Sequence, residues 1–338
     1  MRRAFVTGGS GFLGRYLLDE LRRRGVTARA LVRSPEAERA VGDAGAEPVL
    51  GDLGNPSALR AGLDGCDVVF HAAAIVADWG DADAFHRVNV AGTENVLAAA
   101  RAAGVPRFVH ASSSAVLAGP APVVNASEEA PHPAAPYGLY ALTKGLAEVR
   151  VLAANGDGLA TMVVRPAFIW GRGDTSVLPQ LVAAVRAGRY RWIDHGRHLS
   201  STTHVLNAVE GLLLAAEHGR PGGTYCVTDG PPVEFRTFIL RMLESQGVRP
   251  GNRSLPRPVA WTLAVAVEAV WRHFRIRARP PITRMMVKMF GDEVTLDDSR
   301  ARRELGYVGR VSFEDGIRDM QRADGDGQAG AADGASLR

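Results

Sequence analysis

A tyrosine and a lysine four residues apart, Tyr140 and Lys144, are the residues in this chain best suited to acid–base chemistry. Residues at i and i+4 share one face of a helix, so a helix here puts both side chains on the same side. A free tyrosine has a pKa of about 10, and a nearby ammonium group or an oxidised nicotinamide ring favours its phenolate. Tyr140 can then give a proton to a carbonyl oxygen or take one from an alcohol.

The same pattern on its own is common and usually marks a helix-surface pair. This chain, however, has only two lysines, Lys144 and Lys288. Ser112-Ser113-Ser114 follows an apolar strand pattern over Arg107–Ala111, about 26 residues before Tyr140. A hydroxyl at the carboxyl edge of a sheet can hold a substrate oxygen near Tyr140. We therefore interpret the serine segment and the Tyr–Lys pair as parts of one catalytic centre.

A glycine-rich segment near the N-terminus predicts a phosphate-binding loop. Gly8 permits a tight turn, Gly11 lets the backbone approach a pyrophosphate, and Gly14 lets the following helix pack on the sheet. The helix N-terminus then faces the anion. The spacing is Gly-x-x-Gly-x-x-Gly rather than Gly-x-Gly-x-x-Gly, and a tight turn without a ligand is the alternative. The segment, between a strand and a helix, reads Thr7-Gly8-Gly9-Ser10-Gly11-Phe12-Leu13-Gly14.

The residues after the second predicted strand, Ala28–Val32, bear on the choice of cofactor. An acidic side chain there would bind a ribose 2′-hydroxyl, whereas an arginine accommodates a 2′-phosphate. The strand ends in Arg33-Ser34, and no carboxylate occurs before Glu36. This favours NADP(H), with NAD(H) as the second choice. The alternative is an arginine on a solvated loop of an arginine-rich protein.

Three further segments are candidates at the same edge. Asp52-Leu53 follows the short strand Pro48–Gly51, where Asp52 could accept a hydrogen bond from the adenine amino group or cap the next helix. Ala72-Ala73-Ala74 follows strand Val68–His71, and its small side chains leave room for a ribose. Asn89 could support a water relay to Lys144, or it could be a capping or turn residue.

The elements that must position these groups alternate between strand and helix through the first two-thirds of the chain. Such alternation implies parallel strands joined by right-handed crossovers. Near-continuous apolar strands are buried on both faces. We therefore expect an α/β fold with a Rossmann-type doubly wound parallel sheet. Residues 1–166 form the predicted dinucleotide-binding domain, to which later segments return; residues 167–320 form a smaller, mostly helical substrate lobe, and residues 321–338 a disordered tail.

The amino-acid composition narrows the classes of function that the chain could have. The 338 residues are 46% hydrophobic and 22% charged, which is ordinary for a globular protein. The net charge of +4 comes from scattered residues, so nucleic-acid binding is disfavoured. Cys66 and Cys226 show neither metal spacing nor a disulfide framework, which predicts reduced thiols, no metal site and a cytoplasmic protein. The longest apolar run, Val259–Val267, is too short to span a bilayer but can touch a membrane surface.

Taken together, these residues resemble the extended short-chain dehydrogenase/reductase family. The resemblance implies that Ser114 is the catalytic serine of its segment and that Pro166 lies at the nicotinamide end of the cofactor. It covers about half of the chain. The motifs that carry it are Thr7 to Gly14, Asp52-Leu53, His71-Ala72-Ala73-Ala74, Asn89-Val90-Ala91-Gly92-Thr93, Ser112-Ser113-Ser114, Tyr140-x-x-x-Lys144 and Arg165-Pro166.

The second half is similar to the 3β-hydroxysteroid dehydrogenase branch, through Arg165 to Asp174, the proline-flanked apolar helix Val259–Phe274, and Pro280 to Arg284. This branch includes sterol-4-carboxylate dehydrogenases and bacterial reductases of 2-alkyl-3-keto acids. The resemblance, which extends to about Met320, implies a bulky apolar substrate and a homodimer. The apolar helices would be either a lid over the substrate or part of the core.

Three departures from the family pattern matter. Ala115 follows Ser114, where sugar-nucleotide dehydratases have an Asp-Glu pair after the active-site threonine, so dehydration is disfavoured. Asn207 stands where the branch usually has aspartate. The acidic residue typical of NAD-using members is absent.

The leading hypothesis is an enzyme that moves hydride between NADP(H) and a ketone or secondary alcohol. Tyr140 is its acid/base, Lys144 tunes the tyrosine and holds the nicotinamide ribose, and Ser114 orients the substrate oxygen. A sugar-nucleotide epimerase is the enzymatic alternative, although the apolar second half does not suit a polar nucleotide cleft. A non-catalytic NADP-binding regulatory protein is the other alternative, and it is disfavoured because all three residues are intact.

Overall fold

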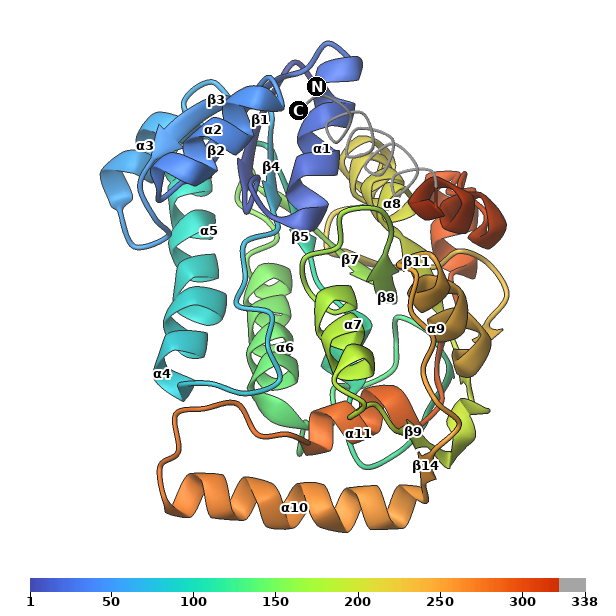
Figure 1. Ribbon diagram of the computed structural model, residues 1–338. Helices are drawn as coiled ribbons and strands as arrows, with labels where there is room; N and C mark the ends of the chain where they lie inside the picture. The colour runs from blue at the N-terminus through green and yellow to red at the C-terminus, as the bar shows by residue number, and fades with distance from the viewer. Residues whose placement is uncertain (322–338) are drawn as a thin grey trace, which may run out of the picture.

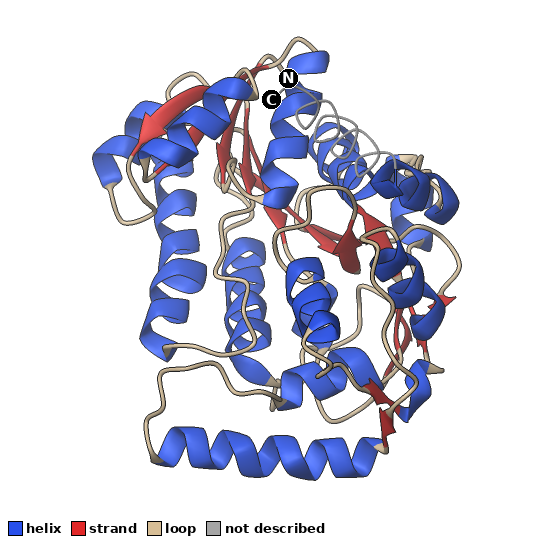
Figure 2. Ribbon diagram, viewed as in Figure 1, coloured by secondary structure: helices blue, strands red, loops and turns tan. Residues whose placement is uncertain are grey.

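The fold is built around one parallel sheet, seen edge-on near the centre of Figures 1 and 2, in a computed structural model that describes residues 1–321. Seven strands lie in the order β12-β7-β5-β4-β1-β2-β3, and each neighbouring pair is parallel. The doubly wound α/β fold is therefore confirmed. The strands are β1 (Arg3–Thr7), β2 (Thr27–Val32), β3 (Glu47–Leu50), β4 (Val68–His71), β5 (Arg107–Ala111), β7 (Ala160–Pro166) and β12 (Gly223–Val227).

Helices cover both faces of this sheet and give three layers (Figure 2). One core cluster packs α1 (Phe12–Arg23), α2 (Pro35–Asp43) and α8 (Val205–His218) against the first face. A second cluster packs α3 (Pro56–Leu63), α5 (Gly92–Ala102) and α6 (Gly138–Ala153) against the other. All four residues of β4 are buried, as expected for a strand covered on both sides.

The strand order reverses between β1 and β4, because the chain runs from β1 outward to β3 and then returns to β4. At such a switch point the loops leave in opposite directions and open a crevice at the carboxyl ends of the strands. Gly8, after β1, and Ala72 to Ala74, after β4, meet in this crevice. The serine segment follows β5, the next strand along, so the predicted candidates share one edge.

Two local details differ from the sequence-based expectation. The sequence pattern over Ala82–Ala103 predicts one helix, whereas the structure has α4 (Ala82–Phe85), a π-helical segment over His86–Ala91, and α5. π-helical turns inside helices often mark functional positions, and this one contains Asn89. In addition, α2 was not predicted, although Ser34 accepts a hydrogen bond from the Ala37 N–H and Pro35 occupies the first helical turn.

The second half contributes a lobe beside the sheet as well as α8 and β12, which belong to the sheet layers. Its core gathers large side chains such as Trp170, Trp192 and Phe238. Residues 322–338, nearly all of the tail predicted over residues 321–338, lie outside the residues that the structure describes. The lobe contains α7 (Leu178–Arg186), α9 (Phe235–Glu244), α10 (Arg257–His273), α11 (Arg284–Gly291) and short strands β8 (Phe168–Trp170), β9 (Trp192–Ile193), β10 (Leu199–Ser200), β11 (Thr202–His204), β13 (Val233–Glu234), β14 (Ser254–Leu255) and β15 (Val294–Leu296). Strand β6 (Val123–Ala126), from the first half of the chain, pairs with β15 of this lobe.

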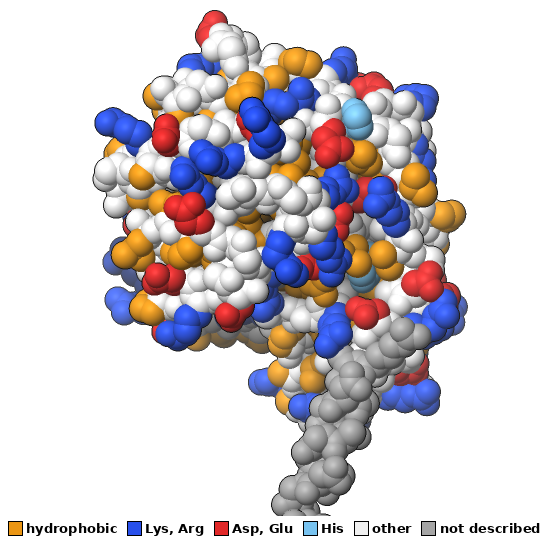
Figure 3. All heavy atoms as spheres, turned by 90° about the horizontal axis from the view of Figure 1, so that it is seen from above, with side chains coloured by type: hydrophobic (Ala, Val, Ile, Leu, Met, Phe, Trp, Pro, Cys, Tyr) orange, Lys and Arg blue, Asp and Glu red, His pale blue; other side chains and the backbone are white. Residues whose placement is uncertain are grey.

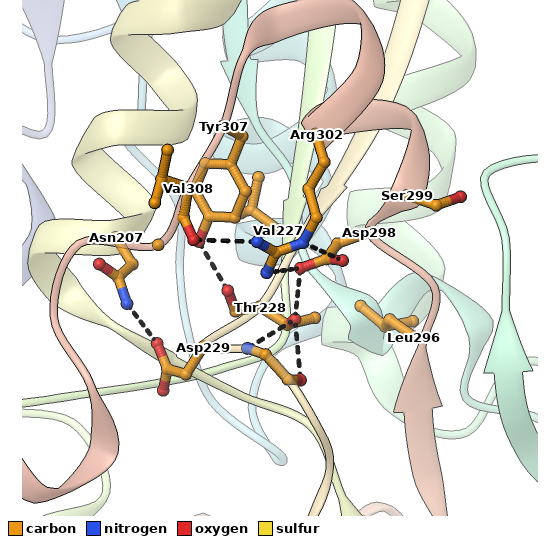
Figure 4. A network of polar contacts seen from close by, with 12 residues as sticks. Asn207, Val227, Thr228, Asp229, Leu296, Asp298, Ser299, Arg302, Tyr307 and Val308 are labelled. Atoms are coloured by element: carbon orange, nitrogen blue, oxygen red, sulfur yellow. Dashed lines mark hydrogen bonds and ion pairs between the residues drawn. The ribbon is translucent and has the colours of Figure 1, made fainter.

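Asp229, just after β12, connects the lobe to the sheet (Figure 4). Its carboxylate accepts hydrogen bonds from Trp170 Nε1 at 2.7 Å and from Asn207 Nδ2 at 2.7 Å. Asn207 also donates to the carbonyl of Val311 at 2.8 Å and accepts from its N–H at 2.9 Å. An aspartate at position 207 could not donate to Asp229 and would place two carboxylates side by side. The departure at Asn207 therefore serves this network.

Candidate active site

One face of α6 carries the groups with acid–base potential. Tyr140, Lys144 and Glu148 are spaced at i, i+4 and i+8, and α6 packs against β7. The helix begins after Tyr137 at Gly138, whose φ of +85° favours glycine. The predicted alignment of Tyr140 and Lys144 on one helix face is thus present in the structure.

The ammonium group of Lys144 is buried at the end of β5. Its Nζ donates to the Ala111 carbonyl at 2.6 Å and to His110 Nε2 at 3.0 Å. Burial lowers the pKa of Lys144 to about 7, and the charge of Glu148 opposes that effect. Lys144 is therefore held at the edge of the sheet, and its lowered pKa lies close to neutral pH.

A row of polar side chains crosses the sheet below this edge. Thr7, His71 and His110 are register partners on β1, β4 and β5. Thr93 Oγ1 donates to a backbone carbonyl, so His71 Nε2 donates to Thr93 at 2.9 Å and His71 Nδ1 accepts from Thr7 Oγ1 at 2.7 Å. Burial, and then the charge of Lys144, lower the pKa of both histidines, that of His71 to about 3. Both rings are neutral and stack at 5.3 Å.

Sequence reasoning missed His110. Its Nε2 accepts from the Lys144 ammonium, so its proton is on Nδ1, and Nδ1 has no hydrogen-bond partner among the residues that the structure describes. The available signal was a histidine within an otherwise apolar buried strand, Arg107–Ala111.

Glu148 forms a buried ion pair that sequence reasoning also missed. Its side chain is fully buried and pairs with Arg165, whose side chain is 4% exposed. Ser112 Oγ donates to Glu148 at 2.7 Å, and His132 Nε2 lies 3.0 Å from it. Burial alone would raise the pKa of Glu148, but hydrogen bonds from His132 and Arg165, the charge of Arg165, and the Ser112 bond lower it to about 2. The carboxylate therefore ties α6 to β7 and to the serine segment.

The three serines have different environments. Ser112 binds Glu148, as described above. Ser113 accepts a hydrogen bond from the Ala115 N–H at 3.2 Å and faces Tyr140: burial raises the pKa of Tyr140, and a hydrogen bond with Ser113 opposes that effect. Ser114 begins a short 3₁₀ helix and is 2% exposed. Ser113 and Ser114 both remain candidates beside Tyr140, and Ser114 is the one to which the family resemblance pointed.

The Lys144 ammonium and the Tyr140 phenol have different surroundings. Lys144 directs its ammonium to Ala111 and His110, and burial dominates the pKa of Tyr140. Tyr140 is therefore a neutral phenol near neutral pH. A neutral phenol suits proton donation to a carbonyl oxygen.

Apolar residues of the second half surround the tyrosine. Met285 and Met289 of α11 share a cluster with Tyr140 of α6 and with Tyr137, which precedes that helix. Ala115 and Ala118, after the serine segment, complete it. The phenol is consequently surrounded by apolar side chains, two of which are flexible methionines that can adapt to an apolar ligand.

The glycine loop has the shape that a dinucleotide pyrophosphate requires. At Gly8, with φ of +75°, an added Cβ would lie 2.7 Å from the Ala73 nitrogen. At Gly14 it would lie 2.1 Å from the Gly8 carbonyl oxygen. Gly11 is the N-cap of α1 and has no capping side chain, so the first N–H groups of the helix remain available to an anion. Phe12 and Leu13, which open α1, are partly buried.

The loop after β4 is clamped in place by Asn89. Asn89 Oδ1 accepts from the Ile75 N–H at 2.7 Å, and Nδ2 donates to the Ile75 carbonyl at 3.2 Å and to Thr143 Oγ1 at 3.0 Å. Ala73 N donates to Thr7 Oγ1 at 3.2 Å. Asn89 thereby fixes the partly buried segment Ala72-Ala73-Ala74 against α6.

The remaining candidates lie at the edges of the crevice. Arg33 is exposed at the end of β2, while Ser34 caps α2. Asp52 accepts from the Gly54 N–H at 2.8 Å, and the helix that follows is capped by Asn55 instead, so the capping alternative for Asp52 is wrong. Leu53 is partly buried after β3, and Pro166 is buried at the end of β7.

Two negative findings concern residues 1–321. They contain no cluster of three or more side chains that could hold a metal ion. None of their helices combines the length and the apolar character needed to cross a membrane. Cys66 and Cys226 are both free and buried.

Comparison with known proteins decides the family. The model of the 3-beta hydroxysteroid dehydrogenase/isomerase family matches residues 5–257. The chain belongs to this family. The resemblance drawn from its motifs is therefore confirmed, and the protein is an oxidoreductase that acts on CH–OH and C=O groups. NAD(P) binding is typical of the family, and the glycine loop described above fits such a cofactor.

Several relatives match nearly the whole chain. The 4-hydroxy-2-methyl-3-oxo-4-farnesyl-3,4-dihydroquinoline-1-oxide ketoreductase of Stigmatella aurantiaca is 50% identical, covering 96% of this chain and 98% of its own. The 2-alkyl-3-oxoalkanoate reductase of Stenotrophomonas maltophilia is 35% identical, covering 94% and 98%. Among solved structures, MoeE5 in complex with UDP-glucose and NAD is 26% identical, with a TM-score of 0.73 and coverage of 96% and 99%.

Proposed function

We propose that this protein is an NADP(H)-dependent ketoreductase that converts a ketone on a bulky apolar molecule, sterol-like or β-keto acyl-like, to a secondary alcohol. The observation that carries the proposal is the neutral phenol of Tyr140 among Ala115, Ala118, Met285 and Met289. The phenol can donate a proton, and its surroundings suit an apolar substrate. The names of the relatives, a farnesyl-quinoline ketoreductase and an oxoalkanoate reductase, agree with this chemistry.

The reduction is balanced by one hydride and one proton. When bound, reduced nicotinamide supplies the hydride to the carbonyl carbon. Tyr140 donates its phenolic proton to the carbonyl oxygen, and the resulting phenolate is reprotonated from solvent. Ser113 and Ser114 are the serines available to orient that oxygen. Lys144 holds positive charge close to the phenolate as it forms, which lowers the cost of the transition state.

The preference for NADP(H) rests on the end of β2. Arg33 is exposed there and has no ion-pair partner among the described residues, so its guanidinium is available to a 2′-phosphate. Asp52 and Leu53, together with Ala72 to Ala74, would line the adenosine side. Gly8, Gly11 and Gly14 would hold the pyrophosphate, and Pro166 would lie near the nicotinamide.

A ketone panel with NADPH and NADH, followed by nicotinamide absorbance, tests the proposal. We expect turnover with a long-chain 3-oxoalkanoate, a 3-ketosteroid or a prenylated quinoline ketone, and none with UDP-glucose. NADPH should give the higher kcat/KM, and Arg33→Asp should lower the NADPH-to-NADH ratio of kcat/KM by about tenfold or more. Epimerisation of UDP-glucose would support the sugar-nucleotide alternative. Cofactor binding without turnover of any ketone would support a regulatory protein.

A further inference from the structure

The two lysines of the chain both lie inside the protein, since Lys144 is 2% exposed and Lys288 is fully buried. The cations of the surface are therefore arginines. Figure 3 shows one face of the molecule, where the cationic side chains are interspersed with acidic ones. Water stabilises a charge on the surface, but a buried ammonium group must find its acceptors within the protein. The acceptors of Lys144 thus decide how its charge is held.

Two acceptors fix the direction of the Lys144 ammonium group. An ammonium group carries three N–H donors and no acceptor. Lys144 Nζ donates to the Ala111 carbonyl at 2.6 Å and to His110 Nε2 at 3.0 Å, and no other acceptor contacts it among residues 1–321. The third N–H is left for a group bound in the crevice. His110 supplies the only side chain of this pair of acceptors, because Ala111 acts through its backbone.

The ring of His110 is held rigidly. The residue lies within β5 and is 1% exposed. Its ring stacks on that of His71, with centroids 5.3 Å apart and planes at 26°. His71 is itself fixed at both ring nitrogens, by Thr7 Oγ1 at 2.7 Å and by Thr93 Oγ1 at 2.9 Å. The row of side chains therefore presents His110 Nε2 as an acceptor of fixed position.

Packing alone does not explain a histidine at position 110. Because Nε2 accepts a hydrogen bond, the proton of the ring is on Nδ1, and Nδ1 has no partner among the described residues. A buried N–H without an acceptor destabilises a fold, and an apolar side chain in this strand would avoid that cost. The benefit that the histidine brings is the acceptor for Lys144.

The other charged and titratable groups around Lys144 do not replace this contact. The charge of Glu148 acts on the ammonium group without a hydrogen bond to it, and burial lowers the pKa of Lys144 to about 7. Among the described residues, only His110 bonds to Nζ through a side chain. The elements packed around Lys144 carry Tyr140 and Glu148 on α6, His71 on β4, Arg165 on β7, His132 beside Glu148, and the exposed Asp83, His86, Arg87, Glu94 and Arg101 on α4, the π-helical segment and α5.

We propose that His110 is a positioning residue for Lys144. By accepting one ammonium N–H at Nε2, it holds the lysine at the end of β5 and keeps it charged while Tyr140 gives up its proton. This inference rests on the proposed function, since a positive charge near Tyr140 is useful in a reduction that leaves a phenolate behind.

Lysine NMR tests the contact without any turnover measurement. In full-length protein labelled with ¹³C at lysine Cε, two signals are expected, and the one missing from Lys144→Met belongs to Lys144. His110→Phe keeps a ring that can stack on His71 but removes the acceptor. It should move the titration midpoint of the Lys144 signal to lower pH by about one unit or more, because the charged form loses a hydrogen bond. His110→Gln, whose amide oxygen can accept in place of Nε2, should restore a midpoint near that of the wild type.

The matched control is Thr93→Val, which removes the acceptor of His71 and leaves both acceptors of Lys144 in place. Its midpoint should equal that of the wild type. Circular dichroism checks folding, and His110→Leu is used if His110→Phe does not fold. A midpoint that stays unchanged in the folded variant without the acceptor would overturn the proposal.

A pH profile of kcat with a ketone substrate adds a second readout. Turnover should fall as the pH rises and Lys144 loses its charge, and His110→Phe should move this fall to lower pH by about the same amount as the NMR midpoint. A loss of kcat that is equal at every pH would reduce His110 to a structural role and overturn the proposal. A shifted NMR midpoint in a protein that turns over no ketone would count against the proposed function and still support the contact between His110 and Lys144.

Discussion

Replacing Glu148 by glutamine should destabilise the fold by about 3 kcal/mol near neutral pH. The pKa of Glu148 is lowered from 4.5 to about 2, and a difference of about 2.5 pH units corresponds to about 3 kcal/mol. An independent estimate agrees, because removing one partner of a buried ion pair costs about 3–5 kcal/mol. Glu148→Gln keeps the shape of the side chain but leaves the Arg165 guanidinium, 4% exposed, without its counter-charge.

The assay is urea unfolding followed by circular dichroism. Glu94→Gln is the matched control, since Glu94 pairs with Arg150 on the surface, where both side chains are about half exposed and such a pair contributes about 0.2–1 kcal/mol. The folded-state pKa of Glu148 lies below the unfolded value, so its contribution is fully present above pH 4.5 and is lost as the pH falls toward 2. The difference between wild type and Glu148→Gln should narrow over that window. A destabilisation no larger than that of Glu94→Gln would refute the reasoning.

Three further predictions concern the candidate site. The folded-state pKa of Lys144, about 7, lies below its ordinary value of 10.5, so the stability of the wild type should rise with pH between these values. Lys144→Met should remove this rise and be the more stable protein at pH 6, by about 5 kcal/mol, the equivalent of a pKa difference of about 3.5 units; thermal unfolding that shows it less stable there would contradict the burial cost. Gly14→Ala should abolish nucleotide binding, measured by calorimetry, because its Cβ would lie 2.1 Å from the Gly8 oxygen; unchanged affinity would contradict the loop assignment. Ser113→Ala should lower kcat more than Ser114→Ala does, and the reverse order would return the catalytic role to Ser114.

Much of the fold followed from local sequence patterns. Apolar runs such as Val68–His71 and the glycine loop before α1 were enough to predict the parallel sheet, because strand burial and helix periodicity are local properties of the sequence. The i, i+4 relation of Tyr140 and Lys144 needed only a helix. The π-helical segment around Asn89 could not be predicted, since it accompanies contacts with Ile75 and Thr143.

The electrostatics of the site depended on contacts between distant segments. His110 and Lys144 are 34 residues apart, and Glu148 and Arg165 are 17 apart, so no periodicity relates them. For the same reason, the sequence did not show that the Ala111 carbonyl and His110 hold the Lys144 ammonium. The different environments of Ser113 and Ser114 likewise depend on the 3₁₀ helix that begins at Ser114.

The most direct test of the central claim compares Tyr140→Phe with Tyr137→Phe. Both tyrosines border the same apolar cluster, but only Tyr140 has a lysine four residues later. With a ketone substrate identified in the panel, kcat is measured alongside the Kd for NADPH. We predict that Tyr140→Phe binds NADPH with unchanged affinity and loses turnover by at least about a hundredfold, while Tyr137→Phe retains most of it. Turnover near the wild-type level in Tyr140→Phe would contradict the account.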